Sequence, residues 1–267
     1  MDHLAVTGSP LPDDRAFVWR CAAAFVVAAA STVYSCATMD GGVSMPGGWT
    51  MSMAFMRMPG QTWLGAAAVF ELVWVVMMAA MMVPVLVIAL LPYRRSLRQR
   101  GISPGRSTAL VAAGYAAVWA ACGAVAYVLG TMSAFATMSA PTLSKLVPVA
   151  TGIVVLLAGG YQLTRWKARQ LDCCHAFPAD AHAWHEGSDA WRAGLRLGLT
   201  CVACCAGLML VLLALGVMNI GVMVAVTAAI TFERVAGRPW RAAAIVGAVT
   251  IAAGCVIVVR ATGASLP

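Results

Sequence analysis

Three cysteines lie close together in an apolar segment, in the pattern Cys201-Val-Ala-Cys204-Cys205. Successive residues of an α-helix are about 100° apart, so these thiols fall within an arc of about 100° on one helix face. Thiolates are the ligands that soft cations such as Cu(I) prefer, and Zn(II) also accepts them. Three thiols at one depth therefore favour a metal site. Cysteine also packs well as a small apolar side chain, and the isolated cysteines are interpreted in that way: Cys21, Cys36, Cys122 and Cys255.

A second apolar segment, residues 63–91, has a helix face of matching chemistry. Six of its side chains fall within about 140° on a helix: Glu71, Trp74, Met77, Met78, Met81 and Met82. Because an ionisable side chain inside a span usually faces the bundle interior, Glu71 orients this face inward and is a possible charge partner. If the two helices are neighbours, Met81 and Met82 lie at the depth of the cysteines and supply thioether ligands. Methionine as gap filler is the alternative.

Two further segments carry soft ligands. Residues 164–189, interpreted as the longest inner loop, contain Cys173, Cys174, His175, His182 and His185, of which Cys174 and His175 are predicted metal ligands. The outer segment, residues 39–58, contains Met39, Met45, Met51, Met53, Met56 and Met58. Thioethers do not form disulfides and remain usable ligands in an oxidising space. The pattern predicts a soft-metal route with methionine outside and cysteine and histidine inside, or else an apolar flap on the membrane surface.

The elements that position these residues are predicted to be transmembrane helices. The chain is 61% hydrophobic and 10% charged, with mean hydropathy +0.84, whereas soluble domains are about 25% charged. Apolar runs of about 17–25 residues can cross a membrane, and about seven are present: residues 17–38, 63–91, 107–130, 146–162, 195–215, 217–232 and 242–259. We predict an all-α, polytopic transmembrane helix bundle, with a helical hairpin turning at Gly216–Asn219.

One domain, residues 17–260, is expected to hold all of these runs. It is preceded by a cytoplasmic segment, residues 1–16, and followed by a tail, residues 261–267; the outer and inner loops span residues 39–60 and 164–190. The first run is longer than the apolar core of a signal peptide, and Asp13 and Asp14 precede it, so it is predicted to be retained as a helix.

The distribution of charge fixes the predicted orientation. Net charge is +8, and with a cytoplasmic amino terminus all 18 lysines and arginines fall on the cytoplasmic side except Arg57, Lys145 and Arg260. This is the positive-inside pattern. The basic charge is thus explained by topology and contact with the lipid bilayer, and no nucleic-acid partner is predicted. A multi-pass protein of the bacterial inner membrane is expected.

Several motifs occur in order along the chain: Met77-Met-Ala-Ala-Met-Met-Val-Pro84, Gly160-Tyr-Gln-Leu-Thr164 with Lys167, and the CxxCC followed by Met209 and Gly216-Val-Met-Asn219. Over about residues 70–235 they resemble the bacterial domain-of-unknown-function 2182 family of predicted metal-binding integral membrane proteins. The resemblance implies metal binding. It matches Cys174 to the second of two family cysteines and Glu233 to a family glutamate. Gln170 replaces the first of those cysteines, for which Cys173 or His175 could substitute, and Ala206 replaces a tryptophan.

The favoured function is a soft-metal-binding membrane protein, with copper as Cu(I) the favoured metal and Zn(II) second, acting in transport, insertion or homeostasis. Cys201-x-x-Cys204 is also a spacing used in thiol–disulfide exchange, so an intramembrane oxidoreductase is the alternative. A third possibility is an accessory subunit that assembles with other membrane subunits. No GxxxxGK[ST], HExxH or GxSxG motif is present, so the sequence leans away from an enzyme.

Overall fold

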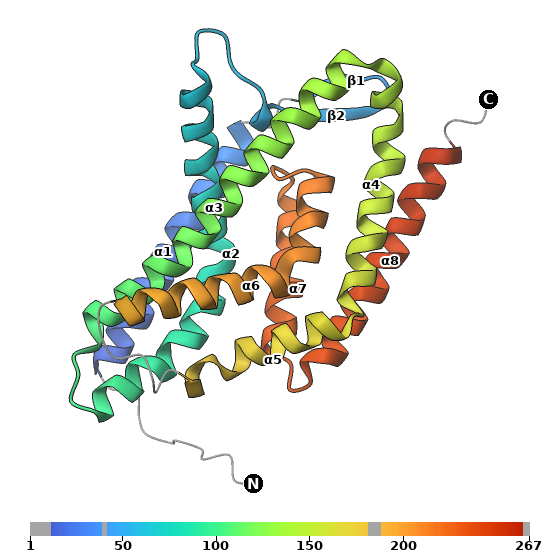
Figure 1. The fold of residues 1–267 in the computed structure, drawn as a ribbon. Helices are drawn as coiled ribbons and strands as arrows, with labels where there is room; N and C mark the ends of the chain where they lie inside the picture. The colour runs from blue at the N-terminus through green and yellow to red at the C-terminus, as the bar shows by residue number, and fades with distance from the viewer. Residues whose placement is uncertain (1–11, 39–41, 181–187, 264–267) are drawn as a thin grey trace.

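A computed structural model describes residues 12–38, 42–180 and 188–263 of the chain. Met39, His182, His185 and most of both predicted terminal segments lie outside these residues. The described part is an all-α bundle with one small β-hairpin (Figure 1). Its elements in chain order are α1 (Pro12–Thr38), β1 (Gly42–Met45), β2 (Trp49–Ser52), η1 (Met53–Phe55), α2 (Trp63–Gln99), α3 (Pro104–Ser139), α4 (Pro141–Gln162), α5 (Arg165–Asp180), α6 (Ser188–Leu215), α7 (Ile220–Val235) and α8 (Pro239–Gly263).

Six of the described helices, α1, α2, α3, α4, α6 and α8, are long and apolar enough to cross a membrane. The protein is therefore a multi-pass membrane protein, as predicted. The remaining predicted run, residues 217–232, corresponds to α7, whose 16 residues extend about 24 Å at 1.5 Å per residue. The turn before α7 forms at Gly216, where φ is +108°, and the Asn219 side chain caps α7 by accepting a hydrogen bond from the Val222 N–H (3.1 Å).

The inner segment is not simply a loop, because most of it forms helix α5. An average of hydropathy does not reveal this helix, because its charged residues lower that average. Among its described side chains, the buried ones share one face: Lys167, Leu171 and Cys174 are spaced four and three residues apart. That spacing is typical of an amphipathic helix, and Figure 1 shows α5 lying across one end of the bundle, beside the α7–α8 turn.

The two ends of the bundle differ in composition. The α2–α3 turn, α5 and the α7–α8 turn, which carry most of the arginines, lie at one end, here called the basic end (Figure 1). The β-hairpin lies at the opposite end, here called the hairpin end. At the basic end Asp14 of α1 accepts hydrogen bonds from Arg98 (2.8 Å) and Arg95 (3.3 Å) of α2, and this ties the first helix to the second. The cytoplasmic placement of the basic end remains a prediction.

Close approach of the α3 and α6 backbones determines the position of α6, the helix that carries the CxxCC motif. A β-carbon at Gly114 of α3 would lie 2.6 Å from the Trp191 carbonyl oxygen, and one at Gly194 would overlap the backbone of Val111. Glycine at both positions therefore lets α3 and α6 pack backbone to backbone, as small residues do in membrane helix pairs. From α4, the Tyr161 hydroxyl donates to the carbonyl oxygen of Ala203, within the CxxCC motif.

Two neighbouring glycines of α4 allow a matched test of helix packing. A β-carbon at Gly159 would lie 2.6 Å from Ile251 Cγ1 and 2.9 Å from the Ile251 backbone nitrogen of α8, whereas one at Gly160 would meet nothing within 4 Å. We expect Gly159→Val to destabilise the bundle by about 1–3 kcal/mol, the usual cost of overpacking. Gly160→Val should change the stability of the bundle little. Thermal unfolding of both variants in detergent checks this, and equal melting temperatures would contradict the packing of α4 on α8.

Candidate metal centre

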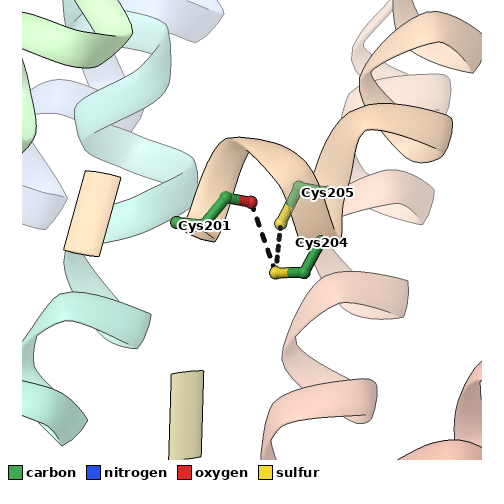
Figure 2. Close-up of side chains that lie close together, drawn as sticks. All are labelled: Cys201, Cys204 and Cys205. Atoms are coloured by element: carbon green, nitrogen blue, oxygen red, sulfur yellow. Dashed lines mark hydrogen bonds between the residues drawn. The ribbon is translucent and has the colours of Figure 1, made fainter. Parts of the chain in front are cut away.

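The three cysteines of the CxxCC motif lie close together on α6, and Figure 2 shows the sulfur atoms of Cys204 and Cys205 beside each other. Cys201, Cys204 and Cys205 are each about 1% exposed, and their Sγ atoms all lie within 4.8 Å of one another. The Sγ atoms of Cys204 and Cys205 are 3.7 Å apart, and Cys204 Sγ donates to the carbonyl oxygen of Cys201 (3.3 Å). The helical arc predicted for these thiols thus gathers them into one buried cluster.

A fourth thiol comes from another helix. Cys174 of α5 is buried, and its Sγ lies 3.8 Å from Cys204 Sγ. With a metal–sulfur bond of about 2.3 Å, sulfur atoms around a tetrahedral ion are about 3.8 Å apart and those around a trigonal ion about 4.0 Å apart. The measured separations of 3.7 and 3.8 Å fit such a shell. The four residues are here called the thiol cluster: Cys174, Cys201, Cys204 and Cys205.

A guanidinium group and a phenol contact the thiol cluster. Arg234 Nη2 of α7 donates to Cys204 Sγ (2.7 Å) and Cys201 Sγ (3.3 Å), and the Tyr115 hydroxyl of α3 lies 3.2 Å from Cys201 Sγ. The hydrogen bond with Cys204, and to a smaller extent the charge of Arg234, lower the pKa of the Cys174 thiol, although burial opposes this. The thiolate, which is the form that binds metal, is therefore favoured at Cys174.

A buried ion pair holds the two helices that contribute Cys174 and Arg234. Lys167 Nζ of α5 lies 2.8 Å from Glu233 Oε1 and 2.7 Å from Glu233 Oε2 of α7, and it also donates to Gln162 Oε1. Lys167 is 0% exposed and Glu233 2% exposed. Cys174 lies two helical turns after Lys167, and Arg234 follows Glu233 directly. The ion pair therefore joins the two helices that bring Cys174 and Arg234 to the thiols of α6.

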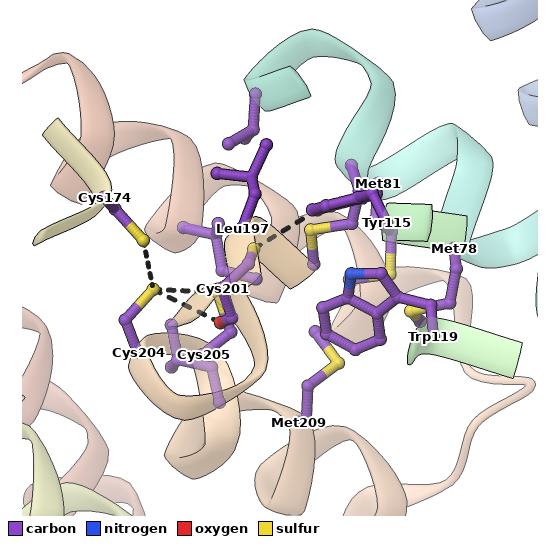
Figure 3. Packing of buried hydrophobic residues seen from close by; sticks show 14 of the residues in the cluster. Met78, Met81, Tyr115, Trp119, Cys174, Leu197, Cys201, Cys204, Cys205 and Met209 are labelled. Atoms are coloured by element: carbon purple, nitrogen blue, oxygen red, sulfur yellow. Dashed lines mark hydrogen bonds between the residues drawn. The ribbon is translucent and has the colours of Figure 1, made fainter. Parts of the chain in front are cut away.

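The predicted methionine ligands lie in the same buried region. Met81 and Met82 of α2 are each 2% exposed and belong to the core cluster that contains all four cysteines. In Figure 3, Met78 and Met81 lie on one side of Cys201 and Cys174 lies on the other. The methionine face of α2, which the sequence predicts to point inward, is thus buried in the structure. The assignment of Met81 and Met82 as ligands stays a prediction.

Two other predicted residues, Glu71 and Cys173, are not brought to the thiols, and the side chain of a third is not described. Glu71 lies ten residues before Met81 on α2, about 15 Å along the helix, and packs at Gly123 of α3, where a β-carbon would lie 2.7 Å from Glu71 Oε2. Cys173 is exposed. His175 belongs to α5, but its side chain lies outside the described residues.

A small cavity borders the thiol cluster. Its volume is about 80 Å³, and its walls come from four helices around α6. They include Leu86 and Ala89 of α2, Tyr115, Cys174, Cys201 and Arg234. Thiols from two helices, a phenol and a guanidinium therefore line one partly open space beside the thiol cluster.

Sequence reasoning missed the roles of Arg234, Lys167 and Tyr115. By sequence Lys167 and Arg234 count among the charges that set orientation, although Lys167 is fully buried and Arg234 is half-buried against the thiols. A signal for Arg234 was present, since Glu233-Arg234 places two charges at the end of an apolar run, where partners are required. No sequence signal distinguishes Tyr115, because its contact with Cys201 joins residues 86 positions apart.

The comparisons with known proteins bear on the chemistry of this site. A family model, PpoB2, described as copper chaperone, matches residues 71–257, which include α2 after its first turns, the thiol cluster, Lys167 and Arg234. No curated protein and no solved structure gives a significant match. The matched segment covers more than half of the chain. The chain belongs to the PpoB2 family, whose description is copper chaperone.

Proposed function

We propose that this protein is a membrane copper chaperone that carries Cu(I) as its cargo on Cys174, Cys201, Cys204 and Cys205. It is a copper-related membrane protein by its family, its apolar helices and its cysteine group. The observation that carries the finer proposal is the sulfur geometry. Cys204 Sγ lies 3.8 Å from Cys174 Sγ and 3.7 Å from Cys205 Sγ, separations that suit two ligands of one soft ion, and Cys201 Sγ lies within 4.8 Å of Cys204 and Cys205. Arg234 donates hydrogen bonds to Cys204 and Cys201 and offsets the negative charge of their thiolates.

The nature of the donors favours Cu(I) over Zn(II). Thiolate and thioether sulfur are the ligands that select Cu(I), whereas zinc sites rarely include methionine. Met81 and Met82 lie in the same buried cluster, so they are proposed as thioether partners, with His175 as a possible ligand on α5. Glu71 is proposed as a charge partner along α2, at a distance from the thiols.

The remaining predictions are part of the same proposal. The arginine-rich end of the bundle supports a cytoplasmic basic end in a bacterial inner membrane, with copper handled in transport, insertion or homeostasis. The ordered motifs within residues 70–235 support membership of the domain-of-unknown-function 2182 family. Other membrane subunits are proposed as partners that receive or supply the metal.

Burial favours metal carriage over thiol–disulfide exchange. Reactive exchange thiols are partly exposed, whereas buried ones are inert, and the CxxCC thiols are each about 1% exposed. An exchange enzyme would show a redox-dependent mobility shift with maleimide in cells, lost when Cys204 is replaced. A copper chaperone should show none.

The test is metal analysis of the full chain, purified under reducing, chelator-free conditions and supplied with Cu(I). We expect copper at the thiol cluster with a first shell dominated by sulfur by X-ray absorption. The double variant Cys201→Ser/Cys205→Ser should lose that copper, and Cys122→Ser/Cys255→Ser, which changes two thiols outside the cluster, should keep it. Unchanged copper and an unchanged sulfur shell in the first variant would overturn the proposed function.

Arg234 gives a prediction of its own. Arg234→Gln removes the positive charge beside two thiolates, and removal of a side chain that supports metal ligands typically lowers affinity about 10- to 100-fold. This loss of Cu(I) affinity should increase as pH falls, because protons compete better for the thiolates when the positive charge of Arg234 is absent. Arg238→Gln, an exposed change four residues away, is the control. Cu(I) competition titrations at two pH values measure both, and equal affinities would contradict the role of Arg234.

A further inference from the structure

A second group of sulfur donors surrounds a cavity at the hairpin end. Its volume is about 250 Å³, and four methionines line it: Met53, Met56, Met58 and Met218. The first three follow β2, and Met218 lies in the α6–α7 turn. The rest of the lining is apolar apart from Thr38 and Gln61. Thioether sulfur is therefore the soft metal donor that this cavity offers.

The segment that carries these methionines is held against the bundle. The Phe55 ring packs on Phe70 of α2, with centroids 5.3 Å apart, and occupies the space that a β-carbon at Gly130 of α3 would fill. The Trp49 indole donates to the Ser144 carbonyl oxygen (2.9 Å), and the Ser144 hydroxyl donates to the Pro46 carbonyl oxygen (2.7 Å). These contacts place Met53 and Met56, on either side of Phe55, at the cavity wall.

A neighbouring hollow at the same end shares one of these methionines. It has a volume of about 530 Å³ and is lined by Cys36, Met51 and Met218, among others. Met218 therefore lies between the two spaces. Sulfur side chains from α1, the hairpin segment and the α6–α7 turn gather at one end of the bundle, although they are far apart in sequence.

Helix α2 joins this cavity to the thiol cluster. Phe70 and Val73 line the methionine cavity, and Val85 and Leu86 line the cavity beside the thiols. From Val73 to Val85 the helix rises about 18 Å. That interval contains the buried methionines of α2, each 2% exposed: Met77, Met78, Met81 and Met82.

We propose that the cavity lined by Met53, Met56, Met58 and Met218 is a second soft-metal site, which binds Cu(I) through thioether sulfur at the hairpin end. Thioethers are neutral, so the ion binds with no proton released and no electron transferred. This distinguishes the site from the thiol cluster, whose ligands must first lose protons. The site stands independently of the thiol cluster; only its use as an entry point for copper rests on the proposed function.

The experiment uses the full chain in detergent with Ag(I), a redox-inert substitute for Cu(I), and methyl-labelled methionine observed by NMR. With the exposed Cys173 and Cys255 changed to Ser in every sample, so that they do not bind silver, we expect two Ag(I) equivalents at neutral pH, one at the thiol cluster and one at the methionine cavity. At about pH 5 the equivalent that depends on Cys201, Cys204 and Cys205 should weaken strongly, while the other persists and shifts the methyl signals of Met53, Met56 and Met218.

The matched variants are Met-to-Leu changes, which conserve volume and are usually well tolerated. Replacement of Met53, Met56, Met58 and Met218 together should remove the equivalent that is insensitive to pH and leave the thiol-dependent one. The control Met132→Leu/Met138→Leu changes two exposed positions of α3 (65% and 54% exposed) and should leave both Ag(I) equivalents unchanged. If the fourfold variant does not fold, Met56→Leu and Met218→Leu singly should each weaken the same equivalent.

The outcomes separate the two proposals. The methionine site is overturned if the chain binds only one equivalent of Ag(I) and loses it when the thiols are replaced. It is also overturned if a second equivalent binds equally well after the methionine changes. Retention of the methionine equivalent in a chain that never binds at the thiols overturns the proposed function and leaves the second site standing.

Discussion

Replacement of Cys204 by alanine is expected to lower the Cu(I) affinity of the thiol cluster roughly 100-fold or more. Its Sγ lies 3.8 Å from that of Cys174 and 3.7 Å from that of Cys205, and it accepts the shortest hydrogen bond from Arg234 (2.7 Å). Apparent binding energies of about 10–16 kcal/mol for four-ligand zinc sites correspond to about 3 kcal/mol for each ligand. At about 1.4 kcal/mol for each factor of ten, one lost ligand gives the stated change.

The measurement for Cys204→Ala is competition with a Cu(I) chelator of known affinity at neutral pH under reducing conditions. Cys122→Ala of α3, outside the thiol cluster, is the matched control and should bind like the unmodified chain. Melting temperatures of the metal-free variants separate lost binding from lost folding. Equal affinity in Cys204→Ala and Cys122→Ala would remove Cys204 from the site.

Lys167→Met is expected to destabilise the protein by about 3–5 kcal/mol. The lysine is 0% exposed, and its loss leaves the Glu233 carboxylate, 2% exposed, without its counter-charge. Breaking a buried pair by removal of one partner is strongly destabilising, because the remaining charge stays buried and uncompensated. Thermal unfolding in detergent, or resistance to protease, measures the loss.

The double variant Lys167→Met/Glu233→Leu tests the reason for that loss. Replacement of a buried ion pair by apolar residues of similar size is often neutral or stabilising, so most of the lost stability should return. If the ion pair also positions Cys174 and Arg234, Cu(I) affinity should remain lowered in this stable variant. Full recovery of affinity would restrict the pair to a structural role, and failure to recover stability would contradict the uncompensated-charge explanation.

The membrane character of the chain and most of its helices could be read from local patterns. Apolar runs of sufficient length predict spans because the hydrocarbon core sets the length that a helix must cover. The turn at Gly216–Asn219 formed where the sequence predicted it. Helix α5 was missed because hydropathy averages over all faces of a helix, whereas the buried residues among the described side chains of α5 lie on the face that bears Lys167, Leu171 and Cys174.

The convergence of Cys201, Cys204 and Cys205 also follows from the local sequence. Helical geometry alone places residues three and four positions apart on one face, so the sequence determined three thiols of the cluster and the inward face of the α2 methionines. Each of these predictions depends on residues that belong to a single helix.

Only the tertiary structure determines which groups from other helices contact those thiols. Cys174 lies 30 residues before Cys204, and Arg234 lies 30 residues after it, and no local periodicity relates such positions. Their meeting depends on how α5 and α7 pack on α6, and the buried Lys167–Glu233 pair joins α5 to α7. The sequence thus determined the CxxCC thiols themselves, and the packing of separate helices determined the fourth thiol and the charge beside them.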